Sequence, residues 1–227
     1  MFDRYATEYD AALSRGLSLS GEDKSFFARR RVEWLRDCLG SSFALPRQVM
    51  DFGCGTGSNA PWLLKLLGAQ RVVGIDDSPK MLEIARQTQG SEHAEFSSID
   101  ACPARGQFDL GFCNGVFHHI APSQRAPAID YVFHSLHVGG LFAFWENSPW
   151  NPGTRYVMSR IPFDRDAILL SPLEARRLLR AGGFEILRTD FLFIFPKILS
   201  WLRPVEPYCA WLPFGAQYQV LCRKSSP

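Results

Sequence analysis

Short apolar runs alternate with longer amphipathic segments from about residue 48 to the end of the chain. Apolar runs separated by segments with helical spacing are typical of βαβ units, which build a mostly parallel sheet. The pattern therefore predicts an α/β three-layer sandwich, with helices on both faces of a seven-stranded sheet. The predicted strands are 48–52, 71–75, 95–98, 108–113, 141–146, 184–193 and 217–223.

The predicted helices carry recognisable ends. Ser78 precedes Pro79, which places an N-cap before a proline at the first helical position. Ser171 and Glu174 form a capping-box sequence, and that helix is expected to stop at the glycine pair 182–183. Two helical stretches before the sheet, 3–13 and 23–39, are predicted to form an N-terminal helical cap.

Two segments, 147–170 and 196–215, fit neither the helical nor the strand period. Irregular segments of this length inside a compact domain either carry function or contain elements that the pattern does not reveal.

Composition and charge narrow the class of protein. With 227 residues, 46% of them hydrophobic and 21% charged, the chain matches one ordinary globular domain. A net charge of +2 gives no electrostatic footprint for nucleic acid, so a small-molecule substrate is expected instead. The six cysteines are scattered without a C-x-x-C pair, and no histidine stands at metal-ligand spacing from them, so no metal site is predicted.

The N-terminus carries carboxylates where a signal peptide needs an apolar core, and no stretch reaches the roughly 18 apolar residues of a transmembrane helix. We therefore expect a cytoplasmic protein with reduced cysteines. The apolar segment 191–195 leaves peripheral contact with a membrane surface open, and no pattern indicates an oligomeric state.

Gly53, Gly55 and Gly57 follow the first predicted strand at once, and a helical pattern begins at Asn59. The glycines therefore lie at the first β-to-α turn, where a doubly wound sheet binds nucleotides. Residues without a Cβ let the backbone approach a ligand, while the free N–H groups of the next helix face the site. The alternative for such a sequence is a tight turn alone.

Asp76 ends the second predicted strand, where a carboxylate can accept hydrogen bonds from both hydroxyls of a ribose. Its neighbour Asp77 could lie beside the adenine or in solvent. Residues 55–60 also satisfy the G-x-G-x-x-G/A fingerprint of nicotinamide dehydrogenases in a shifted frame. In a dehydrogenase the strand runs directly into the first counted glycine, and here it runs into Gly53, which favours the G-x-G-x-G frame.

The segment 49–57 resembles motif I of class I S-adenosylmethionine-dependent methyltransferases. Residues 74–82 are similar to the second motif of that family, and residues 108–120 to its fourth-strand motif. The resemblance extends over most of the chain, from residues 2–10, similar to the capping helix of many members, to the closing strand 217–223.

This resemblance implies a Rossmann-like fold whose last strand is antiparallel. It divides a single domain into a helical cap at 1–45, a cofactor-binding half at 46–146 and a substrate-side half at 147–227.

The resemblance also implies S-adenosylmethionine as the cofactor and S-adenosylhomocysteine as the product. It places the three glycines against the methionine portion, Asp76 on the ribose, and Asn114 beside the methionine amino end. Asp51 would orient the loop or reach that ammonium, and Asp100 would meet the adenine edge or be a plain surface acid. The full implied cofactor set is Tyr9, Asp51, Gly53, Cys54, Gly55, Gly57, Asp76, Asp77, Met81, Asp100, Ala101, Asn114 and Gly115.

In such a fold the acceptor approaches from the carboxyl ends of the fourth and fifth strands, because displacement at the sulfonium is in line. His118, His119 and Glu146 follow those strands. A histidine of near-neutral pKa can take a proton from a hydroxyl or amine, so His118 is predicted to be the catalytic base. Adjacent residues of a regular element cannot both face one cleft, so His119 is predicted to be structural.

The acceptor site is predicted to include His118, Glu146, Asn147, Trp150, Tyr156 and Arg160. Arginines in this stretch could clamp a carboxylate or phosphate, or pair with nearby aspartates to tie the loop to the body. Another set of residues, all of them apolar, could roof an apolar pocket, form a dimer contact or rest on a membrane surface. This set is Ile198, Leu199, Trp201, Leu202, Trp211 and Phe214.

Together these features predict an S-adenosylmethionine-dependent methyltransferase. The expected reaction is in-line transfer to an oxygen or nitrogen atom of a small, partly apolar molecule. Three alternatives stay open: C-methylation of a quinone or lipid-like substrate at a membrane surface, an NAD(P)-dependent dehydrogenase, and a non-catalytic protein that binds S-adenosylmethionine.

Overall fold

The computed structural model describes residues 16–17, 20–164 and 166–225. Within them, seven strands form one sheet: β1 Gln48–Phe52, β2 Arg71–Ile75, β3 Ala94–Ser97, β4 Phe108–Asn114, β5 Leu136–Asn147, β6 Phe184–Leu192 and β7 Gln217–Lys224. Their order across the sheet is β3-β2-β1-β4-β5-β7-β6. The first five strands pair in parallel, whereas β7 is antiparallel to both β5 and β6.

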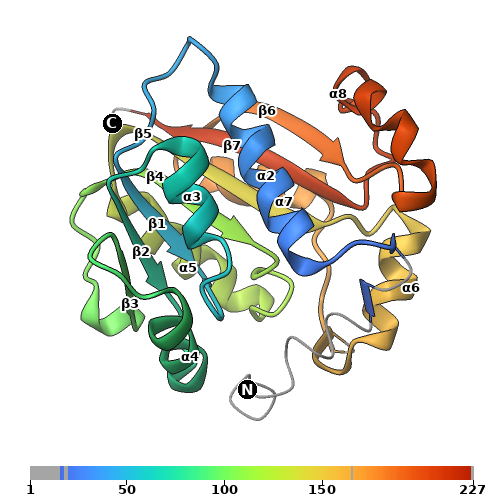
Figure 1. Ribbon diagram of the computed structural model, residues 1–227. Coiled ribbons are helices and arrows are strands. Elements are labelled where there is room, and N and C mark those ends of the chain that lie inside the picture. The colour runs from blue at the N-terminus through green and yellow to red at the C-terminus, as the bar shows by residue number, and fades with distance from the viewer. Residues whose placement is uncertain (1–15, 18–19, 165, 226–227) are drawn as a thin grey trace.

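Helices cover both faces of this sheet (Figure 1). The α-helices are α2 Lys24–Leu39, α3 Ala60–Leu67, α4 Pro79–Gln89, α5 Pro122–Ser135, α6 Pro152–Arg160, α7 Pro172–Ala181 and α8 Glu206–Cys209. Short 3-10 helices occur at η3 Ile99–Ala101, η4 Pro162–Asp164 and η5 Lys197–Val205. Helices α2, α3 and α4 contribute to the core on one face, and α5 and α7 to the core on the other.

The middle of β5 shows why the sheet is buried on both faces. Ala143 and Trp145 point into the core under α2 and α3, whereas Phe142 and Phe144 point into the core under α5 and α7. All four side chains are fully buried. A strand covered on both faces is therefore apolar at every position here, which is the run that the sequence shows.

The predicted fold class is confirmed, and so are most of the predicted boundaries. The exception is β5, which begins at Leu136 rather than Leu141. Its first part contains two glycines, one of them with a φ of 83°, and residues 137–139 are exposed. Leu136 itself is buried in the core, but the exposed residues that follow it interrupt the apolar run, so the pattern does not reveal this part of the strand.

The two irregular segments contain short helices: α6 and η4 in the first, and η5 and α8 in the second. The predicted helix at 3–13 lies outside the described residues, whereas the one at 23–39 is confirmed, with the Asp23 side chain accepting from the N–H of Phe26. No described helix is both long and apolar enough to cross a bilayer.

The capping box of α7 offers a test of local stability. The Ser171 side chain accepts from the N–H of Glu174, and the Glu174 carboxylate accepts in return from the backbone N–H of Ser171. We expect Ser171→Ala to lower the free energy of unfolding by about 1 kcal/mol, measured by urea denaturation. Ser159→Ala is the control, because that exposed hydroxyl only bonds a carbonyl within its own helix. Equal effects of the two changes would contradict the assigned cap.

Candidate active site

The glycine loop between β1 and α3 adopts backbone conformations that favour glycine. Gly53, Gly55 and Gly57 have φ values of 70°, 53° and 75°. A Cβ on Gly53 would lie 2.2 Å from a methyl of Val116, and one on Gly57 would lie 2.7 Å from the ring of Phe96. A Cβ on Gly55 would meet nothing within 4 Å. Gly53 and Gly57 therefore allow the loop to pack against Val116 and Phe96, and Gly55 leaves its backbone accessible to a ligand.

Asp76, at the end of β2, holds this loop against the start of α4. One carboxylate oxygen accepts from the N–H of Gly55 and the other from the N–H of Ser78, both at 2.9 Å. Burial raises the pKa of Asp76, and these two backbone bonds partly oppose that shift. A carboxylate has about four acceptor positions, so Asp76 can still accept a hydrogen bond from a ribose hydroxyl.

Asp51, in β1, is fully buried beneath the loop. Both its oxygens accept from Nδ2 of Asn59, at 3.4 and 3.2 Å. Burial raises its pKa to about 7, although the Asn59 bonds and the charge of Arg31 lower it. A bound cation would remove the cost of ionising this carboxylate.

Asn114, at the end of β4, offers a further acceptor. Its Oδ1 is buried and has no hydrogen-bond partner in the described part of the chain. Asn114 and Gly115 also line a cavity, which is described below. An unsatisfied buried acceptor is costly unless a ligand donates to it. Asp51 and Asn114 thus fit the ammonium end of an amino-acid ligand, and Asp76 fits a ribose.

A cavity of about 530 Å³ adjoins this position. Its walls come from the start of α2, the turn after β4, the segment from Asn147 through η4, and the segment after β6. Phe26, Phe27, Phe193 and Phe195 make much of the wall apolar. The cavity also has a polar region, formed by two histidines and an aspartate.

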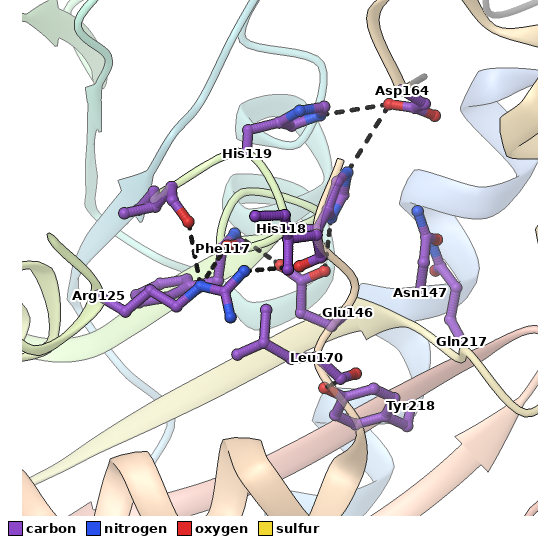
Figure 2. Close-up of polar contacts among 12 residues, drawn as sticks. Phe117, His118, His119, Arg125, Glu146, Asn147, Asp164, Leu170, Gln217 and Tyr218 are labelled. Carbon is purple, nitrogen blue, oxygen red and sulfur yellow. Dashed lines mark hydrogen bonds and ion pairs between the residues drawn. The ribbon is translucent and has the colours of Figure 1, made fainter. Parts of the chain in front are cut away.

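This polar region is a network of buried charges (Figure 2). Nδ1 of His118 donates to Oε2 of Glu146 at 2.6 Å, and the N–H of Phe117 donates to the other oxygen of Glu146 at 2.7 Å. On the far side, Nε2 of His118 lies 3.8 Å from Oδ1 of Asp164, and Nε2 of His119 lies 3.3 Å from the same oxygen. The relative exposure of the three cavity-facing side chains ranges from 3% to 13%.

Carboxylates facing both ring nitrogens change the chemistry of His118. Burial alone would lower its pKa, but Glu146 and Asp164 outweigh burial and raise the pKa to about 9. This shift favours the protonated ring at neutral pH in the ligand-free chain, and the role of His118 as a general base stays a prediction. Both rings line the cavity, so the expectation that only one of the two histidines faces it is wrong, whereas the structural role of His119 stays a prediction. The segment after β4 is a turn rather than a regular element, and a turn can direct adjacent side chains to one side.

Residues 49–140 match the family model described as a methyltransferase domain. This segment of the chain is a methyltransferase domain. The match agrees with the family that the motifs indicate, and the solved structure described below agrees with its cofactor, S-adenosylmethionine.

Among curated proteins, the methyltransferase domain is similar to the ribosomal protein L11 methyltransferase of Burkholderia ambifaria, at 41% identity over 85 residues. That alignment covers 37% of this chain and 26% of the relative. The tRNA U34 carboxymethyltransferase of Shewanella frigidimarina is 37% identical over 122 residues, which is 48% of this chain and 35% of the relative. The chain thus spans about a quarter to a third of these relatives.

Among solved structures, the methyltransferase domain resembles a protein from Thermotoga maritima described as a possible histamine N-methyltransferase. The TM-score is 0.70 at 23% identity, over 99% of this chain and 98% of the other. This likeness shows that the two chains share a fold.

Several residues predicted for the acceptor site do not line the cavity. Glu146 is fully buried behind His118 and does not line the cavity. Trp150 is 46% exposed and stacks on Phe191, and Arg160 is exposed with its guanidinium over the ring of Tyr156. Only Asn147, Tyr156 and His118 of the predicted set line the cavity.

The apolar residues of the second irregular segment do not roof the cavity. Ile198, Trp201, Trp211 and Phe214 are at least 61% exposed, and none of them lines it. The residues that close the cavity on this side are Phe193 to Pro196, directly after β6. The membrane and dimer alternatives for the exposed set stay predictions.

On the cofactor side of the methyltransferase domain, Cys54 and Met81 are buried near the loop and the start of α4. Asp77, Asp100 and Ala101 are exposed and lie outside the cavity. Tyr9 lies outside the described residues.

Sequence reasoning missed Arg31 and Asp164. Arg31 is buried in α2, lines the cavity and donates to Oε1 of Gln217 at 2.9 Å. Arg31 is one of three consecutive arginines, and the sequence does not show which of them lies on the buried face of the helix. Asp164 was visible as one of several charges between Arg155 and Asp166, but the sequence does not show which of them turns inward.

Proposed function

We propose that this chain transfers the methyl group of S-adenosylmethionine to an oxygen or nitrogen atom of a small, partly apolar molecule. The observation that carries the proposal is the cavity beside Asn114 and Gly115, with aromatic walls and a polar region. Its volume of about 530 Å³ lies within the range of small-molecule sites.

The donor is proposed to lie along the carboxyl ends of β1, β2 and β4. Asp76 would hold the ribose, and Asp51 and Asn114 would receive the ammonium. Arg31, buried near Asp51, would face the carboxylate of the methionine portion. The donor supplies a methyl group already activated by its sulfonium.

With an activated donor, the protein's part is to orient the acceptor and exclude water. The phenyl rings at the start of α2 and after β6 exclude water, and the polar region fixes the reacting end of the acceptor. The names of the two curated relatives state a ribosomal protein and a tRNA as substrates. A cavity with walls on several sides instead supports a small acceptor here.

The proposal is tested by following the methyl group. The purified chain is incubated with methyl-labelled S-adenosylmethionine and a cell extract, which is then separated into small molecules, RNA and protein. We expect label in the small-molecule fraction, and S-adenosylhomocysteine rather than NADH to bind in a parallel titration. Label only in RNA or protein would overturn the proposed substrate class. Binding without transfer to any fraction would leave a non-catalytic protein.

Narrowing the cavity gives a sharper test. Val157 lines the cavity from α6, whereas Ser159 on the same helix is exposed and does not. We expect Val157→Phe to lower kcat/KM for the acceptor roughly tenfold or more, with unchanged affinity for S-adenosylhomocysteine. Ser159→Phe is the matched control and should leave both quantities unchanged. Equal kcat/KM in the two variants would mean that the acceptor binds elsewhere.

A further inference from the structure

Three potential metal ligands meet at the polar region of the cavity. His118 and His119 come from the turn after β4, and Asp164 comes from η4, more than forty residues later. One ligand atom from each lies within 4.8 Å of the others. We propose that these side chains bind a divalent first-row transition-metal ion, which would hold the methyl acceptor.

The distances in the cluster suit an ion better than direct hydrogen bonds. Ligand atoms bonded to Zn²⁺ at about 2.0–2.2 Å in a tetrahedral arrangement lie about 3.4 Å apart. The two contacts from imidazole Nε2 to Oδ1 of Asp164 measure 3.3 and 3.8 Å. A charge-assisted N–H···O bond is shorter, at about 2.7–2.9 Å. His118 makes such a short bond to Glu146 with its other nitrogen, so the looser contacts are confined to the side that faces Asp164.

Glu146 supplies the outer partner that metal-binding histidines usually have. Metal-bound imidazoles donate their second ring N–H to a carboxylate or carbonyl, which fixes the tautomer and the ring orientation. Glu146 accepts from Nδ1 of His118 and is itself held by the N–H of Phe117. With the proton on Nδ1, the lone pair of a neutral His118 lies on Nε2, toward Asp164 and His119 (Figure 2).

The ligand types select the class of ion. Mg²⁺ and Ca²⁺ prefer sites made of oxygen atoms, whereas two imidazoles and one carboxylate suit Zn²⁺, Co²⁺, Fe²⁺ or Ni²⁺. Three protein ligands leave at least one position open, and all three residues line the cavity.

The open position narrows the acceptor class, and this step rests on the proposed function. An acceptor carrying a hydroxyl or carboxylate oxygen could bind the ion next to the methyl donor. Contact with the ion would also make such a hydroxyl easier to deprotonate.

The competing explanation is an ionic contact that fastens η4 to the turn after β4. Both explanations require Asp164, but only the first gives saturable metal binding. The exposed pair of His134 and Asp130 provides a matched comparison, since its nitrogen and oxygen also lie 3.3 Å apart, and no third ligand joins them among the residues that the structure describes.

The test is a titration of the full-length chain, freed of metal by a chelator, with Co²⁺ and separately with Zn²⁺. We expect one equivalent of Co²⁺ to bind and to give visible d–d absorption, which Zn²⁺ then displaces. Mg²⁺ should not compete. Asp164→Asn and His119→Ala should each weaken Co²⁺ binding by about 100-fold or more, whereas His134→Ala should leave it unchanged.

S-adenosylhomocysteine binding, measured on the same samples, shows that each variant is folded and tests the donor site separately. Cys38 and Cys209 are free and partly exposed, so thiolate binding must be distinguished. It would add sulfur-to-metal charge-transfer bands and would disappear in Cys209→Ser or Cys38→Ser. The metal site is refuted if the native chain binds no Co²⁺ saturably, or if both Asp164→Asn and His119→Ala bind it as tightly as the native chain. Normal S-adenosylhomocysteine binding together with that outcome would leave the methyl-transfer proposal standing.

Discussion

Asp51→Asn should raise the free energy of unfolding of the ligand-free protein above pH 7, by about 2–4 kcal/mol. The reason is that Asp51 is fully buried and its pKa is raised to about 7 in the folded chain, against an ordinary value of 3.8. Ionising this carboxylate therefore costs more in the folded state than in the unfolded state. Asparagine keeps the shape of the side chain and removes that cost.

The contribution of Asp51 to the free energy of unfolding depends on pH, because the carboxyl ionises at a different pH in the folded and unfolded states. Below about pH 4 the carboxyl is protonated in both states, so its ionisation does not lower the free energy of unfolding. Between about pH 4 and pH 7 the folded state holds a proton that the unfolded state has lost, so stability falls as pH rises, and the loss is complete above pH 7. The difference between Asp51→Asn and the native chain should grow by roughly 2–3 kcal/mol from pH 5 to pH 8.

Urea denaturation at several pH values measures this difference. Asp37→Asn is the control, because that acid is on the surface of α2 with a side-chain exposure of 61%. Asp51→Asn should also bind S-adenosylhomocysteine more weakly than the native chain, since the ammonium of the ligand loses an ionic partner. A difference that does not change with pH would show that Asp51 is ionised normally in the fold.

Asp76→Ala should weaken binding of S-adenosylhomocysteine roughly 10- to 150-fold, which corresponds to about 1.5–3 kcal/mol. Two effects add in this variant. The ribose would lose its hydrogen-bond acceptor, and the N–H of Gly55 would lose the carboxylate oxygen that holds the loop at 2.9 Å.

Isothermal titration calorimetry gives the affinity, with Asp77→Ala as the neighbouring control. Asp77 is exposed, so its removal should change the affinity less than twofold. A melting temperature measured without ligand separates loss of the ribose contact from loss of the fold. Similar losses in the two variants would mean that Asp76 does not hold the ribose.

The sequence predicted that the glycine loop lies beside Asp76, because this arrangement is tied to local order along the chain. A buried strand, a glycine turn and an acid at the end of the next strand follow one another along the chain, and parallel pairing of β1 with β2 brings them together. No long-range information is needed to place Gly55 beside Asp76.

The acceptor side could not be predicted in the same way. His118 meets Asp164 only because α6 and η4 fold back over the turn after β4, and no periodic pattern specifies that path. The pairing bears on the expected role of His118, because the two carboxylates raise its pKa to about 9 and so favour the protonated ring. Trp150 and Arg160 were placed in the site by proximity in sequence, but their side chains point to the surface.

Most of the cavity wall comes from outside residues 49–140, the segment that matches the family model. Within that segment, only Asn114, Gly115, His118 and His119 line the cavity, and the remaining lining residues belong to 17–31, 147–164 and 193–217. The residues around the cavity and the residues of the glycine loop can therefore change independently of each other in evolution. Substitutions in the flanking segments would alter most of the cavity wall while leaving the glycine loop, Asp51 and Asp76 unchanged.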